Sequence, residues 1–179
     1  KFKRQLSQEN YTGFCRAFLL GHSSTKYKTK VGFFDLDHFG HMNNGKYFRH
    51  ADYSRMWLYM ESGLLPVAWK MGTPFVAAGI TIRYRKELNW GQRFTIENSI
   101  VGWDQVSFYN EARFVTAKQK KDPATGKMVE CQVLHATVVV RLHLVKKGKM
   151  RAVLDNMGLN DLPDVHMPHE DVAAWAGSL

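Results

Sequence analysis

The chain has 179 residues, of which 45% are hydrophobic and 23% are charged. This size and composition fit one globular domain with its own core and leave little room for two packed domains. The formal net charge of +9 is compatible with an anionic partner, either nucleic acid, a membrane surface or a phosphate-bearing cofactor. The charge is uneven, since residues 1–30 carry +6, residues 31–150 carry +7 and residues 151–179 carry −4.

Two cysteines, Cys15 and Cys131, lie too far apart in the sequence for a disulfide framework or a common metal-ligand spacing. A reducing, intracellular compartment is therefore expected, and the basic composition favours a mitochondrial location over a cytoplasmic or membrane-associated one. No apolar run reaches the roughly 20 residues that a transmembrane helix needs. The chain begins at Lys1 rather than Met, which suggests that a targeting peptide or an anchor preceded it.

In chain order, the first expected element is a short helix over residues 5–20, followed by a strand over residues 25–34. A longer helix is predicted over residues 44–63, because Asn43 and Asn44 are good N-cap residues and Gly63 with Pro66 marks an end. Two stripes with helical spacing run along this helix. We expect the first to be the better packed and the second to be buried as well. The first stripe consists of Tyr53, Met56, Trp57, Met60 and Leu64. The second consists of Tyr47, Ala51, Ser54 and Leu58.

From residue 75 the hydrophobic period changes to two, which predicts four long antiparallel strands. The clearest alternation runs from Leu134 to Leu144, and the turn residues 122–126 join the last two strands as a hairpin. One helix and several strands indicate an α+β domain in which a curved sheet wraps around the helix. Residues 150–179 are expected to form an irregular tail with a short helix near residues 169–176.

The segment from Asp35 to Tyr47 is the best candidate for chemistry. It joins the first strand to the long helix, so its polar side chains should lie beside the helix N-terminus. Free backbone N–H groups and the positive end of the helix dipole favour an oxyanion there. A carboxylate next to such donors can act as a base or a nucleophile on an acyl carbon. The sequence alone therefore suggests acyl transfer or hydrolysis.

Simpler interpretations of the same residues stay open. Asp35 and Asn43 could serve simply as turn and cap residues, for which Asp and Asn are common. His41 could have the purely structural role of holding the loop in shape by hydrogen bonds. A metal site built from Asp35, Asp37, His38 and His41 is a weaker alternative, because the spacing matches no familiar motif. We therefore assign no metal ligand.

The pattern from Asp37 through Gly40, His41, Asn43 and Asn44 to Tyr47 resembles the active-site loop of hot-dog fold thioesterases of the 4-hydroxybenzoyl-CoA thioesterase type. Residues 83–88 and 102–115 are similar to the subgroup that includes thioesterase superfamily member six. The resemblance covers residues 25–146 and leaves 1–24 and 147–179 as N-terminal and C-terminal extensions. Members of this subgroup carry an N-terminal membrane anchor, and no segment of this chain has the length and hydrophobicity of one.

This resemblance implies an acyl-CoA thioesterase of lipid metabolism, a dimer with a continuous sheet, and a substrate bound at the subunit interface. It implies that Asp37 is the catalytic carboxylate and that the oxyanion donor is the N–H of Asn44 or Gly45. His41 and Asn43 would orient water or the carbonyl. No cofactor is implied, because CoA is part of the substrate.

The strand that carries Arg83, Arg85 and Lys86 offers three cations that could bind the CoA phosphates. A solvated charged face is an equally good interpretation of these residues. As an alternative to an enzyme, the chain could be a catalytically weak hot-dog subunit of a larger, possibly mitochondrial, protein assembly. Nucleic-acid binding rests on charge alone and is the least favoured function.

Overall fold

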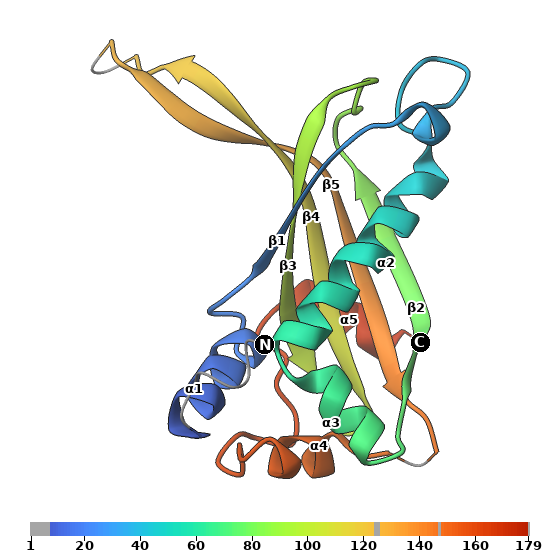
Figure 1. Ribbon diagram of the computed structural model, residues 1–179, viewed down its shortest axis with the longest axis vertical. Helices are drawn as coiled ribbons and strands as arrows, with labels where there is room; N and C mark the ends of the chain where they lie inside the picture. Colours follow the sequence, from blue (N-terminus) through green and yellow to red (C-terminus); the bar gives the residue numbers. More distant parts are fainter. Residues whose placement is uncertain (1–7, 124–125, 147, 179) are drawn as a thin grey trace.

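The computed structural model describes residues 8–123, 126–146 and 148–178. A five-stranded antiparallel sheet, in the order β1-β3-β4-β5-β2, curves around one long helix (Figure 1). The helices are α1 (Gln8–Leu19), α2 (Asn44–Glu61), α3 (Leu64–Lys70), α4 (Met150–Asn156) and α5 (Glu170–Gly177), and a 3-10 turn spans Phe33–Asp35. The strands are β1 (Thr25–Lys30), β2 (Phe75–Tyr84), β3 (Arg93–Trp103), β4 (Ser107–Lys121) and β5 (Met128–Leu144). The predicted α+β class, the long helix and the four long strands are confirmed.

The long strands follow from their alternating pattern. Residues at every second position of β5, from Ala136 to Leu144, are buried against α2, and the intervening residues face the other side of the sheet. The predicted hairpin is also confirmed, because the Asp122 N–H donates to the Lys127 carbonyl at 2.8 Å. Two of its predicted turn residues, 124 and 125, lie outside the described residues. The hairpin extends beyond the body of the sheet as a two-stranded arm (Figure 1).

The prediction of which stripe of α2 packs best was wrong. Tyr47, Ala51, Ser54 and Leu58 are buried against the sheet, whereas the side of the helix bearing Tyr53, Met56, Trp57 and Met60 is 45–58% exposed. Both stripes are apolar, so periodicity finds them without ranking them. The small side chains of Ala51 and Ser54 let the helix axis lie close to the strands, which explains why this stripe is the inner one.

Several boundaries also differ from the prediction. The first strand ends at Lys30 instead of residue 34, because the 3-10 turn begins just after Gly32. Gly63, with a φ of 80°, ends α2 in the left-handed conformation, but Pro66 does not stop helix formation. Pro66 is the third residue of α3, and a proline in the first turn of a helix lacks only an N–H that has no intrahelical partner there.

Both extensions contribute to the hydrophobic core. Cys15, Phe18 and Leu19 of α1 are buried in the same cluster as the inner face of the sheet. The tail adds α4, which the sequence analysis missed, and its Val153 and Leu154 belong to that cluster too. The short helix expected near residues 169–176 is α5, and it lies on the opposite face of the sheet from α2 (Figure 1).

Candidate active site

The loop between β1 and α2 is held in place by Asp35. Its carbonyl accepts a hydrogen bond from the Asn43 N–H at 2.8 Å, and its Oδ2 accepts one from the Gly32 N–H at 2.9 Å. The same Oδ2 lies 3.2 Å from His50 Nε2 of α2. These contacts tie both ends of the loop to the start of the helix, so Asp35 has a positioning role.

Asp37 forms a tight turn with His41. Its Oδ1 accepts hydrogen bonds from the backbone N–H of Phe39 at 2.9 Å and of His41 at 3.1 Å. Its own N–H donates to the His41 carbonyl at 2.8 Å, and Gly40, with a φ of 79°, permits the reversal. Partial burial raises the pKa of the Asp37 carboxyl, but the amide hydrogen bonds and the imidazoles of His41 and His38 outweigh it and lower the pKa overall. Asp37 is therefore an ionised carboxylate at neutral pH.

The N-terminus of α2 lies next to this turn, and its two predicted oxyanion donors differ. Asn43 is the N-cap, and its Oδ1 accepts the Gly45 N–H at 2.9 Å, so this donor is occupied. In the described part of the chain, the Asn44 N–H makes no hydrogen bond with another protein group. Of the two candidates, Asn44 is the one free to bind a substrate oxygen.

A pocket of about 270 Å³ brings several predicted residues together. It is lined by Asp37, His41, Met42, Asn44, Tyr47, Tyr84, Arg85, Lys86 and Glu87. Asn43 and Gly45 stay outside this lining and shape the helix start instead.

Tyr84 is a pocket residue that the sequence analysis did not select. Its hydroxyl donates to the Asn44 carbonyl at 3.1 Å, and its ring packs edge-on against Tyr47 at 5.3 Å. The sequence signal that could have found Tyr84 is the strand alternation, which places it on the α2 side of the sheet. Burial raises the pKa of Tyr47 to about 12, so its phenol stays protonated and cannot serve as a base at neutral pH.

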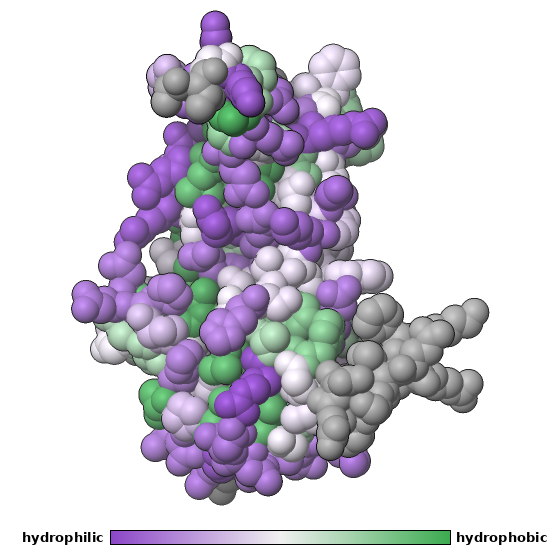
Figure 2. Space-filling view, turned by 90° about the vertical axis from the view of Figure 1, so that its left-hand side faces the viewer, coloured by the Kyte–Doolittle hydropathy of each residue, from purple (hydrophilic) through white to green (hydrophobic). Residues whose placement is uncertain are grey.

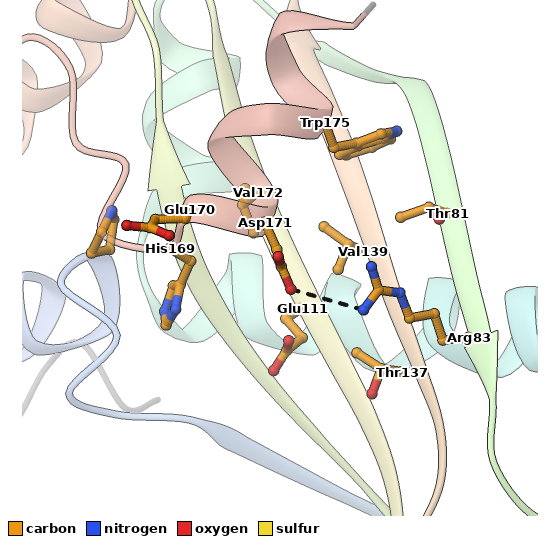
Figure 3. A pocket seen from close by; sticks show the side chains of 11 residues that line it. Thr81, Arg83, Glu111, Thr137, Val139, His169, Glu170, Asp171, Val172 and Trp175 are labelled. Atoms are coloured by element: carbon orange, nitrogen blue, oxygen red, sulfur yellow. Dashed lines mark ion pairs between the residues drawn. The ribbon is translucent and has the colours of Figure 1, made fainter.

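Arg83 lies away from this pocket. Neighbouring residues of a strand point to opposite faces, so Arg83 faces α5 while Tyr84 faces α2. Figure 3 shows its guanidinium directed at Asp171 of α5, with an Nη1 to Oδ2 distance of 3.8 Å. It lines a separate pocket of about 460 Å³ between α5 and the outer face of the sheet. Arg85 and Lys86 are thus at the Asp37 pocket, and Arg83 is not.

The side chains of Asp35, Asp37, His38 and His41 do not converge on a common site. Asp35 contacts His50, while the exposed His38 ring lies 4.0 Å from the Phe39 ring. Within residues 8–123, 126–146 and 148–178, no three His, Cys, Asp or Glu side chains are arranged to hold a metal ion.

No helix among the described residues is both long and apolar enough to span a membrane.

Comparison with known proteins agrees with the sheet and helix described above. The family model of the thioesterase-like superfamily matches residues 31–175. This chain belongs to that superfamily.

Curated relatives match this chain over part of their length. Protein THEM6 of Danio rerio is 39% identical over 143 residues, which cover 79% of this chain and 63% of the relative. Protein THEM6 of Xenopus laevis is 43% identical over 84 residues, which cover 47% of this chain and 41% of the relative. The chain thus spans between about two fifths and two thirds of the length of these relatives.

Solved structures confirm the hot-dog fold. The gentisyl-coenzyme A thioesterase BH1999 superposes with a TM-score of 0.56 at 17% identity, covering 75% of this chain and 99% of that structure. A 1,4-dihydroxy-2-naphthoyl-CoA thioesterase from Synechocystis gives a TM-score of 0.55 at 13% identity, covering 79% and 100%. At such identities the likeness concerns the fold.

Proposed function

We propose that this protein hydrolyses the thioester bond of an acyl-CoA, with Asp37 as the nucleophile or general base. The observation that carries the proposal is the ionised Asp37 carboxylate next to a free N–H at the start of α2, in one pocket. Membership of the thioesterase-like superfamily supports the same reaction class. The CoA thioesterases among the structural neighbours indicate the substrate class.

The geometry of Asp37 suits this role. The two backbone amides bind Oδ1, and no hydrogen bond within the described residues uses Oδ2, which leaves that oxygen for water or the acyl carbon. In the general-base route Oδ2 takes a proton from water, the hydroxide adds to the carbonyl carbon, and the C–S bond then breaks. The thiolate of CoA leaves and receives the proton. In the nucleophilic route Oδ2 adds to the carbonyl carbon, the C–S bond breaks and the CoA thiolate leaves, which gives an anhydride between Asp37 and the acyl group. Water then hydrolyses this anhydride, releasing the free acid and restoring the Asp37 carboxylate.

The N–H of Asn44 would stabilise the oxyanion formed in either route. One such donor is typically worth about 3 kcal/mol of barrier. Its position at the first residue of an 18-residue helix adds the favourable end of the helix dipole. His41 and Asn43 would act on the geometry of this site, His41 from the wall of the pocket and Asn43 as the cap that fixes the helix start.

We propose Arg85 and Lys86 as the contacts for the CoA phosphates, because both line the Asp37 pocket at its solvent side. Arg83 would take part only if the CoA nucleotide crosses the edge formed by β2. This edge strand lies at one end of the sheet order, so a nucleotide could reach both faces there.

A homodimer completes the proposal. β2 is a ten-residue edge strand, and the side of α2 that carries Tyr53, Met56, Trp57 and Met60 is an exposed apolar surface. Pairing of two β2 edges would extend the sheet and satisfy their free backbone groups. Such a dimer would also cover the exposed side of α2.

The first test compares Asp37→Asn and Asp37→Ala with the unaltered protein on acyl-CoA esters of graded length. We expect a loss of kcat of at least a hundredfold with the fold intact, because both changes remove the anionic base. Glu111→Gln, which alters a carboxylate on the opposite face of the sheet, is the matched control and should keep full activity.

Unchanged turnover in the Asp37 variants would refute the mechanism. Absence of turnover in the folded, unaltered protein across all chain lengths, together with co-purification in a large complex, would support the alternative of a structural hot-dog subunit.

A further inference from the structure

Four large aromatic side chains are exposed at one end of the molecule. Phe33, Phe34, Phe39 and Trp90 are 73%, 84%, 72% and 69% exposed. They belong to two neighbouring loops, residues 31–43 and 85–92, which we call together the aromatic end. The Gly91 N–H donates to the Val31 carbonyl at 3.0 Å, and a β-bridge joins His41 to Asn89. The four side chains therefore lie at the same end of the molecule.

Such exposure is unfavourable for a side chain that meets only water. Each buried aromatic residue removes about 150–250 Å² of surface from solvent, and contiguous apolar patches on soluble proteins usually mark an interaction site. The loops themselves are well fixed by backbone hydrogen bonds, so the rings are displayed on a rigid support. A partner that accepts aromatic rings is expected at this end.

A basic groove adjoins these loops. Lys28, Lys30 and Arg93 line it on the outer face of β1 and β3, with the hydroxyl-bearing Thr95 and Thr116 beside them, and its volume is about 570 Å³. In the described part of the chain, none of the three cations has a carboxylate within 4.0 Å, whereas the nearby Lys26 is paired with Glu97. Lys30 and Arg93 are directly paired in the register of the two strands. This concentration of unpaired positive charge favours a phosphate-bearing partner.

The β4–β5 hairpin adds more positive charge at the same end of the molecule (Figure 1). Lys118, Lys120 and Lys121 are exposed along its β4 strand, and Met128 and Val129 are 61% and 44% exposed on β5. In Figure 2, which looks onto the β1 side, hydrophilic residues cover most of the upper half of the molecule. The groove and the hairpin are continuous along β4, so their cations lie at the same end of the molecule as the exposed aromatic rings.

We propose that this end of the molecule docks onto the surface of an anionic lipid bilayer. Phe33, Phe34 and Trp90 would enter the interfacial region, where aromatic rings are favoured. Lys28, Lys30 and Arg93 would contact the lipid phosphates, with the lysines of the hairpin supplying long-range attraction. The inference is independent of the proposed hydrolysis, although it would bring the Asp37 pocket close to membrane-borne acyl chains.

Two other occupants fit the surface less well. A second copy of the chain bound through the same surface would bring each set of unpaired cations against an identical set, which is repulsive. A single-stranded nucleic acid needs ring faces on which successive bases can stack. Phe33 and Phe34 instead stand edge to face, with an interplanar angle of 80°.

The test is sedimentation of the full chain with vesicles of phosphatidylcholine alone and of phosphatidylcholine with 30% phosphatidylserine. We expect binding to the anionic vesicles only, weakened by raised salt. The aromatic variant Phe33→Ser/Phe34→Ser/Trp90→Ser and the charge variant Lys28→Glu/Lys30→Glu should each lower the partition coefficient at least tenfold. None of these five residues lines the Asp37 pocket, so the hydrolysis of a water-soluble short-chain acyl-CoA should not change.

Matched control variants lie at the opposite end of the molecule. Trp69→Ser alters a ring that is 66% exposed on α3, and Lys70→Glu/Lys149→Glu reverses two exposed lysines near α3 and α4. Both should bind anionic vesicles like the unaltered protein, and circular dichroism checks that all variants are folded. Loss of binding in the controls, or equal binding to neutral vesicles, would overturn the proposal. So would binding to single-stranded nucleic acid without vesicle binding, or aromatic variants that only dissociate a dimer.

Discussion

At the scale of single residues, Asp37 should stay ionised well into the acid range. Its amide hydrogen bonds hold the pKa below the ordinary value of 3.8, despite the opposing effect of partial burial. A lowered pKa in the folded state means that ionised Asp37 favours folding above the unfolded-state value, and that this contribution is lost as the pH falls through the lowered pKa. NMR titration of the Asp37 carboxyl carbon, assigned with Asp37→Asn, should give a midpoint below 3.8. A midpoint of 5 or more would contradict this account.

The three cations of residues 83–86 can be separated by charge reversal. Arg85→Glu/Lys86→Glu should raise the KM for acyl-CoA roughly tenfold with little change in kcat, because phosphate contacts act on binding and not on the bond that breaks. Arg83→Glu is the comparison, since its side chain pairs with Asp171 on the other face. An equal rise in KM for Arg83→Glu would show that the nucleotide crosses the β2 edge. An unaltered KM in the double variant would remove Arg85 and Lys86 from the site.

At the scale of elements, helix α2 shows how far a pattern can be taken. Its start at Asn44 agrees with the N-cap chemistry of Asn43, and its end agrees with the left-handed Gly63. The inner face could not be chosen from the sequence, because two stripes are apolar and the choice depends on how closely the helix approaches the sheet. The large side chains of the outer stripe are left without cover in the single chain.

The outer stripe of α2 leads to a prediction about assembly. Met56→Lys/Met60→Lys places two charges in the proposed subunit contact, and the protein should shift from dimer to monomer in sedimentation equilibrium. The change should scarcely affect the stability of a single chain, because both residues are about half exposed. Met128→Lys, at an exposed position on the hairpin, should leave the dimer intact. A monomeric unaltered protein would refute the dimer directly.

At the scale of the whole molecule, the C-terminal segment is an integral part of the core. Leu154 of α4 is fully buried and belongs to the same cluster as the sheet. Leu154→Ala should therefore lower the free energy of unfolding by about 2–5 kcal/mol, measured by urea denaturation. Val165→Ala, at a residue that is 49% exposed in the same segment, should cost much less. If Leu154→Ala lowered the free energy of unfolding as little as Val165→Ala, the tail would contribute little to stability.

The sequence by itself determined the long helix, the long strands and the types of side chain in the loop, although it missed α4. Strand alternation, cap residues and the pattern from Asp37 to Tyr47 are local properties, because each depends on residues that are close together in the sequence. They were enough to predict the α+β class, the long helix and the placement of Asp37 near the N-terminus of that helix.

Only the tertiary structure decided what depends on distant segments. It separated Arg83, on the outer face of β2, from Arg85, which lies just beyond the end of that strand. It also chose Asn44 over Gly45 as the free donor and brought Tyr84 against the helix start. It also joined the loops of Phe33 and Trp90, which are 57 positions apart, into one surface. These relations follow from sheet order and close packing, which bring together residues that have no relation along the chain.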